Sequence, residues 1–139
     1  MPRVNNMLAE MLIPKLEQRF SGRGLRSDVS GRPCAVFPSV HPDVGDIAIY
    51  DDGHELTLEA GEFTHSHFAN YDSSLSPHAK AVDIVDAVMD FLDDLFADRV
   101  VLWGGHERSG GWYRGDASEF CPPDEQLYVW SGPLERSTS

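Results

Sequence analysis

Residues 46–68 constrain the fold most, because apolar and polar side chains alternate there in segments joined by very short turns. The alternation over residues 46–51, 55–59 and 62–68 is typical of strands that bury one face. The dipeptides Asp52-Gly53 and Ala60-Gly61 separate these segments, and they are too short to lead back to a parallel neighbour. The region is therefore predicted to form an antiparallel meander.

Two segments show the 3.6-residue periodicity of helices that bury one side. In residues 4–20, apolar side chains recur every four positions, and Pro14 predicts a kink or a division into two short helices. Residues 76–98 begin with Ser76 and Pro77, which are residue types preferred at the N-cap and at the first helical position. The apolar stripe of this second helix is broad, which favours packing on a sheet.

Further strands are predicted at residues 33–37 before the meander, and at 100–103, 111–114 and 127–130 after the second helix. The order of elements is therefore α-β-β-β-β-α-β-β-β. A chain of 139 residues has the size of one domain, and we expect a single α+β domain over residues 1–139. In this domain, a mostly antiparallel sheet carries an N-terminal helix and a long central helix on one face.

The chain is strongly acidic, with 11 Lys and Arg against 23 Asp and Glu and a formal net charge of -12. This charge disfavours binding to nucleic acids and to anionic membranes. It would attract a basic protein partner, although solubility alone also accounts for an acidic composition. One face of the second helix concentrates the acidic side chains that we predict as an interaction surface: Asp83, Asp86, Asp90, Asp93 and Asp94.

Cys34 and Cys121 are the only cysteines, and neither belongs to a CxxC motif. They predict reduced thiols rather than a disulfide framework or a thiolate zinc site, while a single bridge between them stays open. No apolar run approaches the roughly 20 residues that cross a bilayer, and the first residues do not lead into the apolar core of a signal peptide. We therefore expect a cytoplasmic protein.

Histidines gather where the apolar face of the meander is predicted to end. If Asp52-Gly53 and Ala60-Gly61 are both two-residue turns, one carboxylate and several imidazoles share the face of Ile49 and Leu58. These candidate ligands are Asp51, His54, His65 and His67. Imidazole and carboxylate groups suit zinc, iron, nickel or manganese, so the cluster predicts a divalent metal site. An open coordination position on the metal would permit hydrolysis.

Two alternatives to a metal site stay open. The histidines can stabilise the edge of the core through hydrogen bonds to Asp51, to Asp72 or to the backbone, or they can form a pH-sensitive patch. In addition, a glycine bulge at Gly61 would shift one strand against the next and scatter the cluster.

The sequence contains no phosphate-binding loop, metalloprotease helix motif, nucleophile elbow or calcium-binding loop, so catalysis is not favoured. Three functions remain. The first is a non-catalytic protein-interaction module, with a homodimer left open. In size, acidity and element order the chain loosely resembles small bacterial secretion chaperones and toxin-immunity proteins, and we assign it to no family. The second is a metal-binding protein or metal-dependent hydrolase. The third is a small-ligand binder with a pocket between sheet and helix. No cofactor other than a divalent metal is expected.

Overall fold

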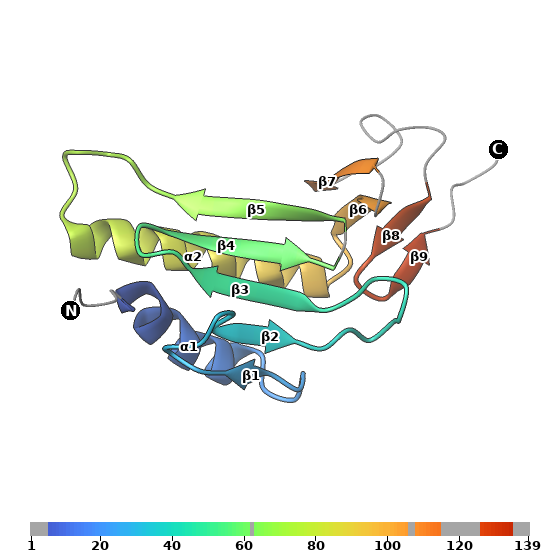
Figure 1. Cartoon of the computed structure of the whole chain (residues 1–139), viewed down its shortest axis with the longest axis horizontal. Helices are drawn as coiled ribbons and strands as arrows, with labels where there is room; N and C mark the ends of the chain where they lie inside the picture. Colours follow the sequence, from blue (N-terminus) through green and yellow to red (C-terminus); the bar gives the residue numbers. More distant parts are fainter. Residues whose placement is uncertain (1–5, 62, 106–107, 115–125, 135–139) are drawn as a thin grey trace.

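The described strands form two antiparallel sheets, and the long helices lie on one side of the larger sheet (Figure 1). The structure, a computed structural model, describes residues 6–61, 63–105, 108–114 and 126–134. The elements in chain order are α1 (Met7–Arg19), β1 (Arg26–Ser27), β2 (Ala35–Phe37), β3 (Ile47–Asp51), β4 (Glu55–Ala60), β5 (Thr64–Ala69), α2 (Pro77–Phe96), β6 (Val100–Gly105), β7 (Arg108–Arg114), β8 (Leu127–Val129) and β9 (Gly132–Leu134).

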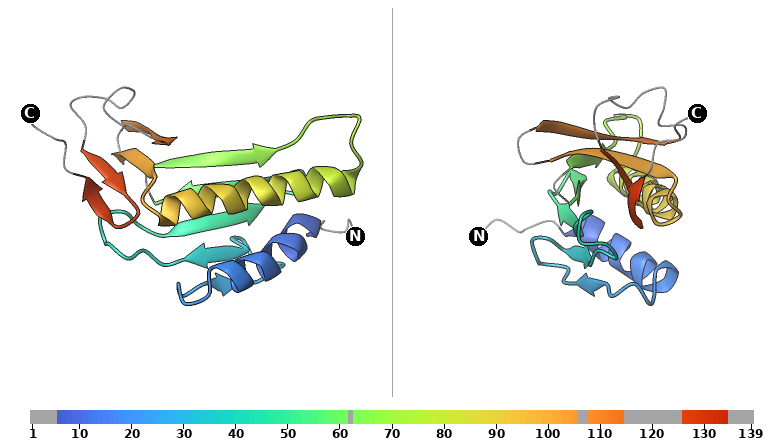
Figure 2. Two further views of the ribbon diagram at one scale, coloured as in Figure 1. Left: turned by 180° about the vertical axis from the view of Figure 1, so that it is seen from behind. Right: turned by 90° about the vertical axis from the view of Figure 1, so that its right-hand side faces the viewer.

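The larger sheet is the predicted meander, with its strands in the order β1-β2-β3-β4-β5. Seen from behind, α1 and α2 lie side by side in front of it, so its other face carries no described helix (Figure 2). The smaller sheet has the order β7-β6-β8-β9, and its strands run across those of the meander near the end of α2. The α+β fold with antiparallel sheets, an N-terminal helix and a long helix is thus confirmed. The division into two sheets and the short strands β1 and β9 were not predicted.

The apolar stripe of α2 forms the centre of the core. Its inward side chains are buried against the sheets and α1: Ala81, Ile84, Val85, Val88, Met89, Phe91, Leu92 and Leu95. On its outer side, Asp83, Asp86 and Asp90 are exposed, which confirms the predicted orientation of the helix. Ser76 caps the helix as predicted, because its side-chain oxygen accepts a hydrogen bond from Ala79 N–H at 3.1 Å.

Aromatic contacts join α2 to distant parts of the chain. The ring of Phe96 packs edge-on against three rings at centroid distances of 5.1, 5.1 and 5.2 Å. They belong to Phe20, which follows α1, to Phe37 in β2 and to Trp130, which follows β8. Phe91, one turn earlier, contacts one ring from each sheet at 5.7 and 4.8 Å, Phe68 and Trp112. Offset and edge-on pairs of this kind add stability beyond the area they bury.

α1 is one continuous helix that includes Pro14, so the alternative of two short helices is wrong. The N-cap residue Asn6 makes no side-chain capping bond. Instead, Asp51 at the end of β3 accepts a hydrogen bond from Ala9 N–H at 2.9 Å. A carboxylate is favourable at a helix N-terminus, so the sheet itself caps the helix that packs on it.

The end of α2 is held to the smaller sheet by Asp98. This residue has a φ of 61°, the left-handed conformation that commonly ends a helix, and Arg99 N–H closes the end by donating to Asp94 O at 2.8 Å. The Asp98 carboxylate accepts hydrogen bonds from Ser131 N–H at 3.1 Å and from Ser131 Oγ at 2.6 Å. The β8–β9 turn is thereby tied to the helix end.

Replacing Leu92 with Ala should lower the free energy of unfolding by about 2–5 kcal/mol, because it empties a fully enclosed site. Urea denaturation measures the change. The matched control is Val82→Ala on the same helix, where the side chain is 37% exposed and the expected change is below about 0.5 kcal/mol. Equal changes in the two variants would contradict the described packing of α2.

Replacing Asp51 with Ala should lower the free energy of unfolding by about 1–2 kcal/mol, since the first turn of α1 loses its acceptor. Asp51→Asn keeps an acceptor oxygen and should cost less. Amide hydrogen exchange gives the local readout: Ala9 N–H should exchange faster in Asp51→Ala. If exchange at Ala9 is unchanged, the cap has no energetic role.

Candidate functional site

The β3–β4 turn lies one residue beyond its predicted position. Asp52 N–H donates to Glu55 O at 3.0 Å, so Gly53 and His54 are the central residues of the turn. Gly53 has a φ of 90°, as the first central residue of a type II′ turn requires. Asp51 therefore pairs with Leu56, and His54 lies in the turn instead of opposite Asp51. The buried face of both strands is nevertheless the predicted one.

The β4–β5 turn places the side chains of β5 on the opposite faces of the sheet from those predicted. Ala60 still belongs to β4 and pairs with Thr64, which displaces the register from the predicted one by an odd number of residues. His67 consequently lies opposite Thr57 and His65 opposite Glu59, on the face away from the helices. The predicted convergence of the candidate ligands on the face of Ile49 and Leu58 is therefore wrong; these ligands were Asp51, His54, His65 and His67.

Gly61 is the physical reason for this register. Its N–H donates to Asp46 O at 2.9 Å, so the pairing of β4 with the chain before β3 continues past Ala60. Gly61 has a φ of 54°, and a Cβ atom there would lie 1.9 Å from Val44 O. Only glycine fits so close to another backbone. Ala60 and Gly61 are thus held against their neighbours and cannot form the two-residue turn that the sequence suggested.

The candidate ligands now occupy separate places. Asp51 accepts hydrogen bonds from the backbone N–H groups of Ala9 and Gly53, at 2.9 and 2.8 Å. His54 is exposed in its turn, whereas the rings of His65 and His67 contact each other edge-on at 5.2 Å on the opposite face. Within the described ranges, no three or more His, Cys, Asp or Glu side chains are grouped so that they could hold a metal ion.

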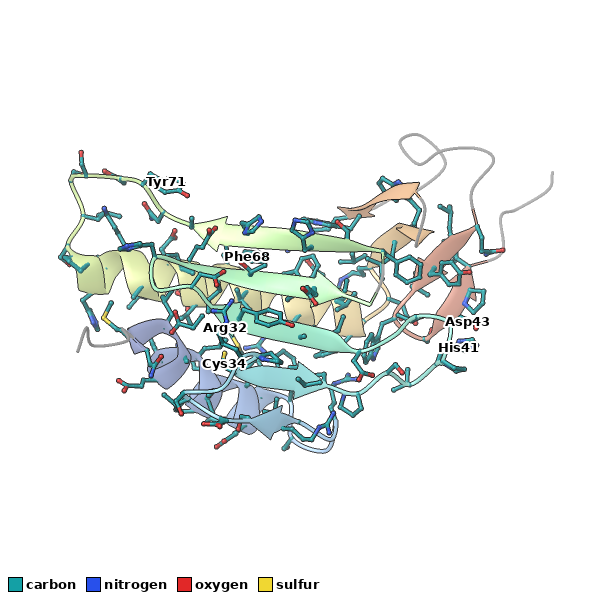
Figure 3. All side chains as sticks on the ribbon, in the orientation of Figure 1. Arg32, Cys34, His41, Asp43, Phe68 and Tyr71 are labelled. Atoms are coloured by element: carbon teal, nitrogen blue, oxygen red, sulfur yellow. The ribbon has the colours of Figure 1, made fainter. Side chains whose placement is uncertain are left out.

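A connected set of polar side chains covers the face of the meander that no described helix covers. We call it the open-face cluster, and its members are Arg32, Tyr50, Asp52, Glu55, Thr57, Glu59, His65 and His67. Figure 3 looks onto this face, with Arg32 labelled beside β3. Sequence reasoning recognised part of the cluster as the polar side of the strands but placed the two histidines on the other side.

One half of the open-face cluster is centred on Asp52. Its carboxylate accepts hydrogen bonds from Thr57 Oγ1 at 2.5 Å and from Arg32 Nη1 at 3.1 Å. The bond from Thr57, followed by that from Arg32, lowers the pKa of the Asp52 carboxyl below its ordinary value. The Arg32 guanidinium also lies 5.4 Å from the centre of the Tyr50 ring, and Tyr50 donates to Glu59 Oε2 at 3.4 Å.

The other half of the cluster is centred on His67. Its Nδ1 lies 3.1 Å from Thr57 Oγ1 and 3.3 Å from Glu55 Oε2. Because the Thr57 hydroxyl donates its proton to Asp52, it accepts from His67, which favours the tautomer with the proton on Nδ1. The ring is thus oriented by two acceptors, and Nε2 is left as the nitrogen that can accept a proton or a hydrogen bond.

The acidic side chains predicted as an interaction surface on α2 are largely engaged within the chain. Two of their contacts connect α2 to α1: Asp93 with Arg19 at 2.5 Å and Asp86 with Lys15 at 3.7 Å. The other contacts are Asp94 with Arg99 at 3.0 Å and with Arg114 at 3.2 Å, and Asp83 with Asn70 at 2.8 Å. Basic side chains therefore offset much of the charge of this helix face.

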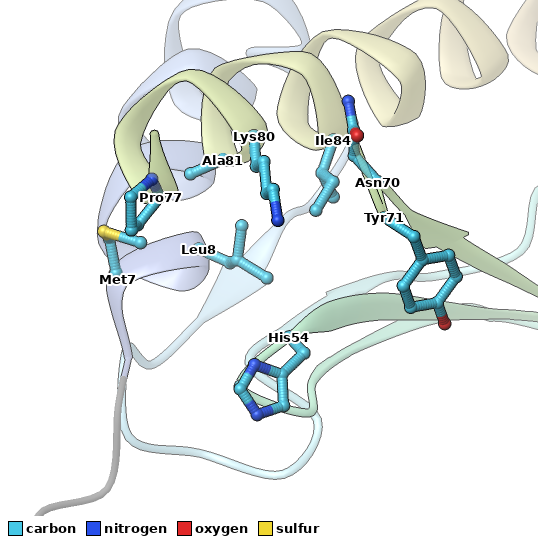
Figure 4. Close-up of a pocket in the computed structure, with 10 residues that line it drawn as sticks. Met7, Leu8, His54, Asn70, Tyr71, Pro77, Lys80, Ala81 and Ile84 are labelled. Atoms are coloured by element: carbon cyan, nitrogen blue, oxygen red, sulfur yellow. The ribbon is translucent and has the colours of Figure 1, made fainter. Parts of the chain in front are cut away.

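A cavity of about 430 Å³ lies where the N-terminal ends of α1 and α2 meet the β3–β4 turn and the loop between β5 and α2 (Figure 4). Apolar side chains make up much of its wall: Met7, Leu8, Pro77, Ala81 and Ile84. The other side chains that line it are His54, Asn70, Tyr71 and Lys80. The sequence suggested a pocket between sheet and helix but not its place, because the lining comes from distant segments that carry no shared motif.

Cys34 is fully buried, and Cys121 lies outside the described residues. Burial, followed by the nearby negative charge of Asp51, raises the pKa of the Cys34 thiol to about 11. The thiol is therefore protonated near neutral pH and is a weak nucleophile.

In comparisons with known proteins, no family model, no curated protein and no solved structure matches the chain. Among the described helices, none has the length and apolar character needed to span a membrane.

The raised pKa of Cys34 makes stability pH-dependent at alkaline pH. The unfolded chain releases the thiol proton near pH 9 and the folded chain near pH 11, so stability is full below about pH 9 and falls as the pH rises toward about 11. Urea denaturation at several pH values in a Cys121→Ala background measures this fall. The same series in Cys34→Ala should show a shallower fall, and identical slopes would contradict the assignment.

Proposed function

We propose that the chain is a non-catalytic protein-interaction module that binds a basic protein segment on the open face of the meander. The observation that carries this proposal is the open-face cluster, in which exposed and half-buried side chains hold one another through direct contacts. Most exposed polar side chains must lose rotamer freedom when a partner binds, which weakens the complex. Side chains that are already ordered lose less.

The composition of the cluster also suits protein binding. Tyrosine and arginine are enriched among the residues that dominate binding energy at protein interfaces. Here Tyr50 and Arg32 lie together, and Asp52 holds the guanidinium at 3.1 Å. Neighbouring side chains from β4 and β5 extend the surface around them.

The charge of the face favours a basic segment. Arg32 already compensates Asp52, whereas Glu55 and Glu59 have no ion pair with a lysine or arginine in the described part of the chain. The formal net charge of -12 would attract a basic partner from a distance and make association sensitive to salt. On α2, by contrast, arginines and a lysine already accompany the acids.

Binding is a better reading of this surface than catalysis. His67, Thr57 and Glu55 form a hydrogen-bonded set, but they lie on an open sheet face where water is not excluded from the imidazole. Acid–base chemistry and charge stabilisation are strongest in enclosed sites. The proposal places the protein in the cytoplasm. A homodimer stays a prediction, and light scattering in solution can test it.

A backbone NMR titration tests the proposal. The probe is a short peptide of alternating lysine and serine, added to the isotope-labelled full chain at low and at high salt. We expect the amide shifts to concentrate in β3, β4 and β5 and the affinity to fall as salt is raised. Shifts confined to other elements would reject the proposed face.

Two charge-matched variants separate the open face from α2. Glu55→Gln with Glu59→Gln should weaken peptide binding at least about tenfold, because the proposed contacts lose both carboxylates. Asp83→Asn with Asp90→Asn removes the same charge from α2 and should have a much smaller effect. If the α2 variant weakens binding as much or more, the acidic face of α2 is the interaction surface.

A further inference from the structure

We propose that the cavity between the N-terminal ends of α1 and α2 is a binding site for a carboxylate carried on a small apolar body. It lies apart from the open-face cluster, so it is independent of the function proposed above. Its volume of about 430 Å³ falls in the range of small-ligand sites, which is about 300–1,000 Å³.

The apolar part of the ligand is indicated by the wall of the cavity. Leu8 and Ala81 are buried parts of the core, and Ile84 continues their surface along α2. An apolar chain that lies against them removes its own hydrocarbon surface from water, which is favourable. Tyr71, 84% exposed in the loop before α2, stands at the rim of the cavity as a further apolar contact (Figures 3 and 4).

The carboxylate is indicated by Lys80. Its side chain extends from α2 into the space bounded by Leu8, Ile84 and His54 (Figure 4). Among the described residues that line the cavity, Lys80 carries a charge and no Asp or Glu is present. An ammonium group beside apolar walls pairs strongly with a carboxylate that enters with it.

The carboxylates near Lys80 accept hydrogen bonds from other residues. Hydrogen bonds from Ser74 Oγ at 2.6 Å and Ser74 N–H at 2.9 Å, together with the charge of Lys80, lower the pKa of the Asp72 carboxyl. The Asp83 carboxylate accepts a hydrogen bond from Asn70 Nδ2 at 2.8 Å. Within the described residues, no carboxylate lies within ion-pair distance of the Lys80 ammonium, whereas the chain's other lysine, Lys15, lies 3.7 Å from Asp86. Lys80 is therefore available to a ligand.

The two neighbouring helix ends give a second, independent argument. The N-terminus of α1 already receives a carboxylate, that of Asp51, on Ala9 N–H. The first turn of α2 contains no acidic residue, and Ser76 satisfies one of its N–H groups. Residues of the first turns of α2 line the same cavity, and the dipole of the helix favours a negative charge near this end.

Binding of hexanoate to the full chain, followed by amide shifts of Ala81 and Ile84, tests this proposal. 1-Hexanol and hexylamine have the same number of carbon atoms and should bind at least about tenfold more weakly, because neither can form an ion pair with Lys80. An acetylated dipeptide ending in leucine, with a free or an amidated C-terminus, shows whether a protein C-terminus is the better source of the carboxylate. Hexanoate that causes no shifts, or hexylamine that binds equally well, would overturn the proposal.

Lys80→Met keeps an unbranched side chain that is one atom shorter, and it removes the charge. It should weaken hexanoate binding at least about tenfold and leave 1-hexanol binding unchanged. Lys15→Met is the matched control, since it removes the other lysine of the chain, outside the cavity. Urea midpoints of both variants verify that the fold is retained. Equal affinity of the two variants for hexanoate would exclude the role of Lys80.

Discussion

The contacts that Phe91 and Phe96 make from α2 hold together parts of the fold that are far apart in the sequence. Phe91 touches a ring of the meander and a ring of the smaller sheet, and Phe96 touches the residue after α1, a ring of β2 and the residue after β8. Large rings in a buried helix face bury more surface than any aliphatic side chain could. Because these contacts lie on one side of the meander, the other side remains open for polar side chains.

The part of the fold that depends on local patterns could be predicted from the sequence. Ser76 and Pro77 predicted the start of α2. The alternation of apolar and polar residues in β3 and β4 predicted which face of these strands is buried, although the β3–β4 turn lies one residue beyond its predicted position. The faces of β5 could not be predicted, because they depend on the fit of Gly61 against Val44, a contact between residues distant in the chain. The strand β1 could not be predicted either, because it has two residues, both exposed, and so shows no alternation of apolar and polar side chains.

The acidic face of α2, which stays a predicted interaction surface, shows how contacts within the chain modify the charge that the composition suggests. A formal net charge of -12 suggested that the densest acidic segment would be the interaction surface. In the structure, α2 brings its acids close to arginines from other segments, among them Arg19 and Arg114. At the cavity, the charged side chain among the described lining residues is a lysine, Lys80. Local pairing, and not composition, decides what a surface can attract.

The turn that follows β4 has a consequence for how this protein can change in evolution. Exposed turns normally tolerate insertions and deletions, because their length affects little beyond themselves. Here the close fit of Gly61 holds the start of the turn, so losing one residue after it would rotate every side chain of β5 to the opposite face. Phe68 would leave the core and the imidazole of His67 would enter it. Turn length at this position should therefore be as strictly retained as a buried core residue.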